Sequence, residues 1–182
     1  MPCFYTSVRY CAFPVYKHKV ISYMLRRLIC LVAAILVLVL PTNPALAATN
    51  DRYLVRFLHV TEPIDLKLDE NGETRSYSPE SILRGKELFE NSCLNCHVGG
   101  ATLPDPQFSL ALNKLQGANP PRDNINNLVA FMRQPMVYDG STETFWCREV
   151  PESWMTQDQI ESLAAFVLTA AERAPGWGTD QF

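Results

Sequence analysis

The sequence predicts a mainly α-helical domain that is preceded by a short N-terminal β-hairpin. After residue 78, apolar residues recur at three- and four-residue spacing, and each such run begins at a residue that can cap a helix. Before residue 78, a run in which apolar and polar residues alternate is followed by Asn71-Gly72, and this pattern indicates a β-hairpin. The sequence contains no repeat and no low-complexity tract, so these elements are expected to form one small domain.

Residues 1–47 are predicted to be an export signal. Two arginines precede a thirteen-residue apolar run at residues 28–40, and Ala45-Leu46-Ala47 follows it. This order is typical of a cleaved secretory signal peptide, and the run is short for a membrane span. We expect cleavage near Ala47. Because the part before Met24 is long for such a signal, the true start is either Met1 or Met24.

The charge of the exported part limits its partners. Residues 1–47 contain five of the sixteen basic residues and no acidic residue, so the rest carries eleven Lys and Arg against nineteen Asp and Glu. Its formal charge is therefore −8. This charge disfavours nucleic acid and favours a basic protein partner. We expect a soluble or peripheral protein rather than a transmembrane one.

Residues 48–77 are predicted to form an arm of strands and turns. Ile64, Leu66 and Leu68 alternate with polar residues, and residues 74–77 can return as the partner strand after a two-residue Asn71-Gly72 turn. His59 is then an exposed histidine in a strand of this arm.

The first helix of the domain at residues 78–182 is predicted to begin at Ser78 and Pro79. Serine is a preferred cap, and proline is tolerated at the first helical position. Gly99-Gly100 and residues 104–106 are expected to be loop after this helix.

Two further helices are predicted after a proline-rich stretch. Asp123 is expected to cap the second, which runs to about Arg133. Residues 137–154 are then loop. The last helix begins with Thr156 and Gln159 in a capping-box arrangement, and Pro175-Gly176 follows its end.

The segment Cys93-Leu94-Asn95-Cys96-His97 is the attachment signature of a c-type haem. Two thiols at this spacing can form thioethers to the two vinyl groups of a porphyrin, and the adjacent histidine can ligate the iron. The alternatives are a thioredoxin-like redox pair, half of a zinc site, or a disulfide. A redox pair does not need His97, and a zinc site needs a second Cys/His pair. The sequence therefore predicts one covalently attached haem c at Cys93 and Cys96, with His97 as axial iron ligand.

The motifs around this segment resemble a known family. Gly85-x-x-x-Phe89, the haem motif and the closing helix are similar to a class I c-type cytochrome. A more specific resemblance, from about residue 66 to residue 178, is to the cytochrome c-550 (PsbV) family, as a divergent paralogue; it rests on Cys96-His97-Val98-Gly99-Gly100, Pro120-Pro121-Arg122-Asp123-Asn124-Ile125 and Tyr138-Asp139-Gly140. The resemblance implies a class I cytochrome c fold, the lumenal side of photosystem II as a partner, and the thylakoid lumen or periplasmic side as location.

The residue available as sixth iron ligand differs from the one in that family. Its members are similar in having a histidine shortly after Tyr-Asp-Gly, whereas no histidine follows His97 here. Cys147 stands seven residues after Gly140, near the family's histidine, and nine residues before Thr156, near the ligand methionine of small algal cytochromes. Cys147 is therefore the predicted sixth ligand, and Met155 is the fallback.

Other assignments stay open at this point. Met132, Met136 and His59 are further candidates for the sixth ligand, although the two methionines are expected to be packing residues. Cys147 could instead be a buried spectator thiol or form an intermolecular disulfide. Two aromatic residues, Phe145 and Trp146, are expected beside the haem edge. Arg122 and Arg148 are each expected either to bind a haem propionate or to be solvated at the surface.

Three functions are compatible with these residues. The first is a low-potential one-electron carrier, because a thiolate ligand favours ferric iron. The second is a structural extrinsic subunit of photosystem II, and the third is a haem-based sensor with an exchangeable sixth ligand. No general acid or base group surrounds the motif, so we do not expect an enzyme.

Overall fold

The computed structural model describes residues 25–32, 51–103 and 108–179. The chain divides into two units, Met1–Leu46 and Ala47–Phe182. In the first unit, residues 25–32 are helical and exposed. Within the part of the chain that the structure describes, no helix combines the length and the apolar character needed to cross a membrane. The predicted cleavage site near Ala47 lies outside the described residues.

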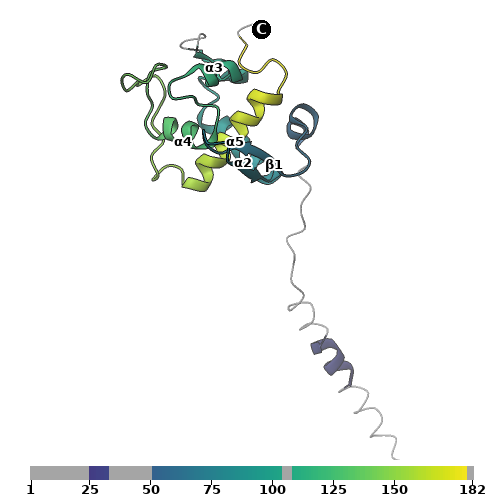
Figure 1. Cartoon of the computed structure of the whole chain (residues 1–182). Coiled ribbons are helices and arrows are strands. Elements are labelled where there is room, and N and C mark those ends of the chain that lie inside the picture. The colour runs from purple at the N-terminus through teal and green to yellow at the C-terminus, as the bar shows by residue number, and fades with distance from the viewer. Residues whose placement is uncertain (1–24, 33–50, 104–107, 180–182) are drawn as a thin grey trace, which may run out of the picture. The chain divides into compact units, whose positions relative to one another are not determined.

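The second unit is mainly helical, with a small sheet of two strands, as predicted. Its helices α2 (Pro79–Ser92), α3 (Leu112–Gly117) and α4 (Ile125–Arg133) all surround α5 (Gln157–Arg173) (Figure 1). Because α5 packs against all three of these helices, most of its residues are buried. The core is therefore built on this last helix.

Helices α2 and α5 pack with their backbones in close approach at Gly85. A Cβ atom placed on Gly85 would overlap the carbonyl oxygen of Ser162 and the Cβ atom of Phe166. Only glycine fits at this crossing, since any side chain would force the helices apart. The crossing fixes the position of the C-terminal end of α2, where the haem motif begins.

The ends of α2 and α5 confirm the predicted caps. Ser78 Oγ accepts a hydrogen bond from the Ser81 N–H at 3.3 Å, at the start of α2. At the start of α5, Thr156 and Gln159 each accept a hydrogen bond from the backbone of the other, at 3.4 and 2.9 Å. These reciprocal bonds satisfy amide groups that a helix leaves without partners.

The prediction for the second helix is wrong by one residue. The cap of α4 is Asn124, whose side chain accepts a hydrogen bond from the Asn127 N–H at 2.9 Å and is fully buried. Asp123 lies instead 3.2 Å from Lys67 in an ion pair. Both residue types are good caps, and burial selects the neutral amide over the charged carboxylate.

The β-hairpin is present, but its turn is longer than predicted. Strands β1 (Ile64–Lys67) and β2 (Thr74–Tyr77) are antiparallel, with Ile64 opposite Tyr77. Leu68 N–H donates to the Glu73 carbonyl at 2.7 Å, so four residues separate this pair. Asp69 accounts for the larger turn, because its carboxylate accepts hydrogen bonds from the backbone of Asn71 and Glu73.

The prediction of only strands and turns before the hairpin is wrong. A π-helix, η1 (Leu54–Leu58), precedes it and contacts α2 and α5. Leu54 and Leu58 are fully buried, so their four-residue spacing is a helical signal that the alternation nearby obscured. His59 ends η1 in a left-handed conformation, with φ 53°, and is exposed there rather than in a strand.

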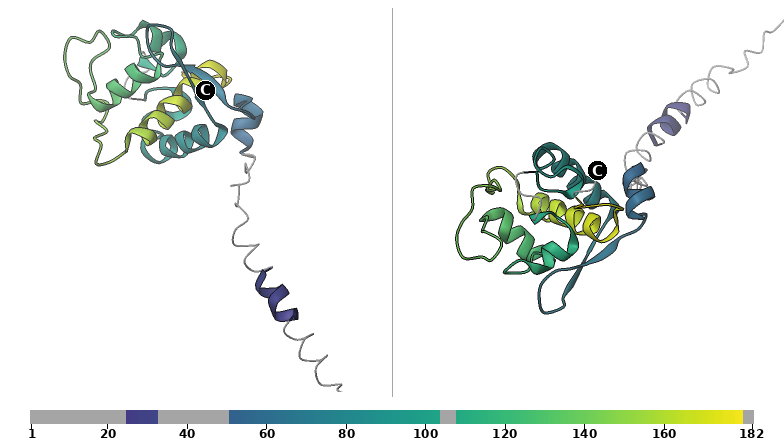
Figure 2. Two further views of the ribbon diagram at one scale, coloured as in Figure 1. Left: turned by 60° about the horizontal axis from the view of Figure 1, so that its bottom comes forward. Right: turned by 90° about the horizontal axis from the view of Figure 1, so that it is seen from above.

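The remaining connections lead to the site. After α2, a short 3-10 turn, η2 (Val98–Gly100), precedes the segment 104–107, which lies outside the described residues. Helix α3 was not predicted. The connection between α4 and α5 contains no helix or strand, as predicted, and projects beside the helices as an extended loop (Figure 2). An isolated bridge between Met136 and Glu143 closes its base.

Candidate haem site

The haem motif lies at the C-terminal end of α2, where the chain leaves the helix in tight turns. Cys93 N–H still donates to the Phe89 carbonyl at 2.8 Å, and the N–H groups of Cys96 and His97 donate to the Cys93 carbonyl at 3.1 and 3.0 Å. These bonds fold the five residues into a compact turn that is fixed to α2. The structure thus brings the two thiols and the imidazole together at one helix end.

His97 is oriented by a hydrogen bond to a threonine. Its Nδ1 lies 3.2 Å from Thr102 Oγ, and the Thr102 hydroxyl donates to the Phe108 carbonyl at 2.8 Å. Because the hydroxyl proton is used on Phe108, Thr102 accepts and His97 Nδ1 donates. Burial lowers the pKa of His97, although the Ala101 backbone opposes the shift. The neutral imidazole therefore keeps Nε2 free as a lone-pair donor.

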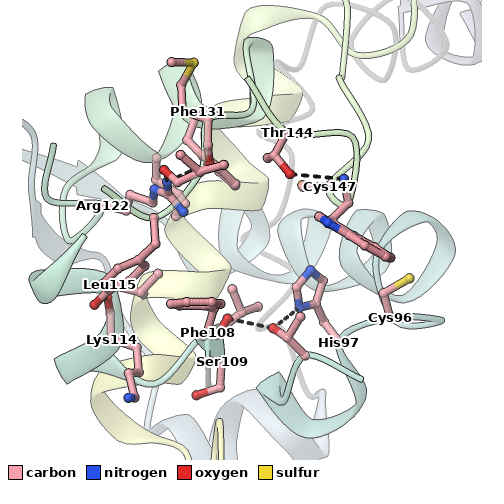
Figure 3. Close-up of a pocket in the computed structure, with 17 residues that line it drawn as sticks. Cys96, His97, Phe108, Ser109, Lys114, Leu115, Arg122, Phe131, Thr144 and Cys147 are labelled. Carbon is pink, nitrogen blue, oxygen red and sulfur yellow. Dashed lines mark hydrogen bonds between the residues drawn. The ribbon is translucent and has the colours of Figure 1, made fainter. Parts of the chain in front are cut away.

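A cavity of about 400 Å3 adjoins the motif (Figure 3). Its volume is within the range of cofactor pockets, and its walls are mainly apolar. The walls come from the motif, the turn after it, α3, α4 and the α4–α5 loop. The lining residues are Cys96, His97, Thr102, Phe108, Ser109, Leu110, Lys114, Leu115, Arg122, Leu128, Phe131, Met136, Val137, Tyr138, Thr144, Trp146 and Cys147.

Among the candidates for the sixth ligand, Cys147 and Met136 line the cavity. Met155, the fallback, is 2% exposed in the core and does not line it. Met132 is likewise buried in the core, and His59 ends η1. The geometry therefore brings His97 and Cys147 to one cavity, as the sequence spacing predicted, and leaves ligation by Cys147 as a prediction.

The surroundings of Cys147 act on its pKa in opposite directions. Burial raises the pKa of the thiol, whereas the positive charge of Arg122 opposes the increase. The cysteine sulfur lies 3.9 Å from the Arg148 carbonyl. Burial also raises the pKa of Cys93, to about 12, with a smaller contribution from the nearby Cys147. Cys93, Cys96 and Cys147 are all free of disulfides, so each thiol is available to a cofactor.

Arg122 lies inside the cavity rather than on the surface. Its Nη2 donates to the carbonyls of Met136 and Val137 at 3.0 and 2.9 Å, and its guanidinium lies 3.8 Å from the centre of the Phe131 ring. A fixed cation thus faces the cavity and joins α4 to the start of the α4–α5 loop. Its remaining N–H groups fit a carboxylate such as a haem propionate.

Three candidate neighbours of the haem lie in different environments. Arg148 is exposed, with its guanidinium 5.4 Å from the Trp154 ring, and it does not line the cavity. Phe145 is 94% exposed and lies outside the cavity, and Trp146 lines the cavity although it is 79% exposed. Both aromatic residues were predicted beside the haem edge, and of the two only Trp146 lines the cavity. Arg148 takes the solvated position, one of the two alternatives left open for it.

Sequence reasoning missed other cavity residues. Lys114 adds a second cation to the cavity wall, and Tyr138, whose hydroxyl donates to the Lys114 carbonyl at 2.8 Å, holds α3 against the loop. Phe108 lies beside Tyr138, with 4.8 Å between ring centres. The only signal for this group was Tyr138 in the Tyr-Asp-Gly motif, because α3 has too few turns to show a clear period.

These residues fit a covalently bound haem. The cavity supplies apolar walls for a porphyrin and two cations, Lys114 and Arg122, for its two carboxylates. The thiols of the motif lie beside it, and His97 presents a free ring nitrogen. A metal held by side chains alone fits less well, since the described part of the chain contains no group of three or more His, Cys, Asp or Glu that could bind one.

Comparison with known sequences gives consistent matches. The profile described as the cytochrome c-550 domain matches residues 57–182. The chain is 46% identical over 159 residues to a cytochrome c-550-like protein of Trichodesmium erythraeum, and the matched region covers 87% of this chain and 96% of that protein. It is 54% identical over 133 residues to photosystem II extrinsic protein V of Gloeobacter violaceus, and this matched region covers 73% of this chain and 72% of that protein.

A solved structure agrees with these matches. The PsbV2 cytochrome from Thermosynechococcus elongatus superimposes with a TM-score of 0.70 at 53% identity, covering 71% of this chain and 98% of that chain. The class of fold predicted from the sequence is thereby confirmed.

Proposed function

The chain belongs to the cytochrome c-550 family, whose members carry one covalently bound haem c, and we propose that it is an exported, low-potential one-electron carrier with His97 and Cys147 as iron ligands. The observation that carries this proposal is the shared cavity. His97 and Cys147 are fifty residues apart in sequence and line the same cavity, whereas Met155 is buried elsewhere. The bound haem c supplies a centre that gains and loses one electron.

Cys93 and Cys96 would hold the cofactor through two thioether bonds. His97 would bind the iron through Nε2, because Thr102 Oγ accepts the proton on Nδ1 and so fixes the tautomer. The apolar walls would exclude water, and Lys114 and Arg122 would donate hydrogen bonds to the porphyrin carboxylates. Each of these residues binds or orients the cofactor, and none acts as an acid or base on a substrate.

Cys147 sets the potential in this proposal. A coordinated thiol loses its proton, and the thiolate donates electron density that stabilises ferric iron. A methionine ligand is neutral and lacks this effect, so thiolate ligation gives the lower potential. The charge of Arg122 compensates part of the negative charge that the thiolate adds to the cavity.

The cellular location follows from the export signal and the relatives. We place the mature chain in the thylakoid lumen or on the periplasmic side, peripheral to the membrane. One relative is named photosystem II extrinsic protein V, which makes the lumenal side of photosystem II the first complex to test. The charge of −8 on residues 48–182 favours a basic partner.

A structural subunit of photosystem II is the second candidate function. The observation that favours it is the 54% identity to the extrinsic protein of Gloeobacter violaceus. Binding through acidic groups is screened over about 8 Å at physiological ionic strength, so it should weaken as salt rises. Release of the protein from photosystem II membranes by a salt wash, together with loss of oxygen evolution, would support this candidate over the carrier.

A potentiometric titration tests the carrier proposal. The purified protein should show one reversible one-electron transition, and the Cys147→Met variant should show it at a higher potential, because a thioether replaces a thiolate. An irreversible transition would overturn the carrier function. Equal potentials for the parent and the variant would overturn ligation by Cys147, while leaving the carrier function standing.

A further inference from the structure

The α4–α5 loop carries two aromatic side chains that the core does not use. Phe145 is 94% exposed and Trp146 is 79% exposed. Among the large apolar residues that the structure describes, these are the two highest values, and the two residues are adjacent. Burying an aromatic side chain is a major source of stability, so Phe145, which lies outside the haem cavity and is left in solvent, marks an interaction site, with Trp146 beside it.

The loop presents this pair on a fixed frame. Thr144 N–H donates to the Pro135 carbonyl at 3.0 Å, and its Oγ accepts from the Trp146 N–H at 3.3 Å. Further along, Val150 N–H donates to the Met132 carbonyl at 2.9 Å, which returns the chain to α4. The two ends of the segment are thus held to the domain, and Phe145 and Trp146 project from the part between them.

The aromatic pair lies directly beside the proposed iron ligand. Trp146 lines the haem cavity, and Phe145 lines a separate outer hollow. Cys147 lines both the cavity and the hollow. A partner that covers Phe145 would therefore be separated from the haem cavity by little more than the side chain of Cys147.

The charges around the pair indicate what covers it. Residues 139–152 contain four exposed acidic side chains and one exposed basic side chain, giving a net charge of −3. The acidic residues are Asp139, Glu143, Glu149 and Glu152, and the basic residue is Arg148. An apolar centre with a charged rim is typical of a protein interface, and the acidic rim is complementary to Lys and Arg.

We propose that Phe145 and Trp146 form the docking surface for a basic electron-transfer protein, which exchanges its electron with this cytochrome beside Cys147. The proposal rests on the carrier function above. In the exchange, one electron leaves the ferrous haem iron and reduces the metal centre of the partner, and no proton or bond is transferred. The acidic rim accelerates the encounter, and the aromatic pair holds the short-lived complex.

Two small oxidants of opposite charge test this surface. Tris(phenanthroline)cobalt(III) is a cation with aromatic ligands and imitates the partner, whereas ferricyanide is an anion without them. The ferrous protein is mixed with each oxidant in a stopped-flow instrument, and the second-order rate constant is followed as salt is added. Cobalt(III) takes one electron to become cobalt(II), and ferricyanide takes one to become ferrocyanide.

Phe145→Ser should reduce the rate with the cobalt complex about fivefold and leave the ferricyanide rate and the midpoint potential unchanged. Glu149→Gln should weaken the salt dependence of the cobalt reaction, because one acidic group of the rim is lost. The control is Phe57→Ser, which removes a 41% exposed aromatic side chain from η1 and should change neither rate. Phe145 is almost fully exposed, so its replacement does not disturb the fold.

Equal cobalt rates for the parent and Phe145→Ser would overturn the docking surface while the reversible titration still upheld the carrier function. A parent protein that cannot be reduced reversibly would overturn both. Sedimentation of the parent and Phe145→Ser at micromolar concentration completes the test. A dimer that dissociates on this substitution would assign the surface to a second copy of the chain and overturn the proposal.

Discussion

His97 Nδ1 and Thr102 Oγ lie 3.2 Å apart, in a relay that ends on the Phe108 carbonyl. The threonine hydroxyl has one proton and gives it to Phe108, so it can only accept from the imidazole. A histidine that ligates a metal through one nitrogen becomes a stronger donor when its other N–H is hydrogen-bonded. Thr102 is therefore placed to orient His97 and to adjust how strongly it donates to the iron.

Replacing Thr102 with Val should raise the midpoint potential. Valine has nearly the same shape but cannot accept the Nδ1 proton, so the imidazole donates less and ferric iron is less stabilised. Thr102→Ser keeps the hydroxyl and should stay close to the parent. Potentiometric titration of the three proteins measures this difference. A shift that is equal in the Val and Ser variants would mean that packing, rather than the hydrogen bond, is responsible.

Arg122 should contribute to both stability and potential. Arg122→Met removes two hydrogen bonds from a charged donor to backbone carbonyls, so the free energy of unfolding should fall by about 2–3 kcal/mol. It also removes a positive charge near Cys147, which should lower the midpoint potential. Urea denaturation and potentiometry measure the two effects.

Arg122→Lys separates the effects of charge and geometry. Lysine keeps the positive charge but lacks the planar fork that bonds to two carbonyls. Its potential should remain near that of the parent, while its stability should fall toward that of Arg122→Met. If both variants keep the stability of the parent, the bonds to Met136 and Val137 do not hold the loop.

The crossing of α2 and α5 should not tolerate a methyl group at Gly85. Gly85→Ala places Cβ against the Ser162 carbonyl and Phe166, so the helices must separate, at a cost of about 3 kcal/mol or more. Gly72→Ala is the control, because its Cβ meets no atom within 4 Å and only its φ of +89° is unfavourable. We expect it to cost about 1 kcal/mol. Thermal unfolding monitored by circular dichroism distinguishes the two, and equal losses would contradict the close approach.

Lys86 on α2 should stabilise the fold in a pH-dependent way. Burial opposes its charge, but hydrogen bonds and attraction from Glu90 and Asp51 outweigh burial and raise its pKa. A raised pKa of a basic group stabilises the folded state below the unfolded value of about 10.4, and the contribution is lost as pH rises through the folded pKa. The stability difference between the parent and Lys86→Met should be constant from about pH 7 to 9 and shrink above 10.5. A difference that persists at higher pH would show that packing is the cause.

Local signals in the sequence predicted the elements that carry their own caps. Ser78 and the Thr156/Gln159 box lie where predicted, because capping depends on residues three apart in the chain. The π-helix η1 could not be predicted in this way, since the burial of Leu54 and Leu58 depends on α2 and α5. The position of each element end thus followed from sequence only where its partner was local.

The residues of the site likewise divide into those that the sequence predicted and those that it did not. The spacing of the haem motif and of Cys147 predicted two residues that line one cavity. Thr102 and Lys114 were not found, because nothing near them in sequence indicates that they face His97 or the porphyrin. The outward direction of Phe145 also depends on how the α4–α5 loop is held to Pro135 and Met132.

The low-temperature electron paramagnetic resonance spectrum of the ferric protein tests ligation by His97 and Cys147 most directly, because its g-values depend on the axial ligands. The account predicts a low-spin spectrum of the histidine-thiolate type. Cys147→Ser should convert it to a high-spin or different low-spin form, and Met155→Leu should leave it unchanged. A spectrum that Cys147→Ser preserves and Met155→Leu alters would contradict the account and identify an ordinary methionine-histidine cytochrome.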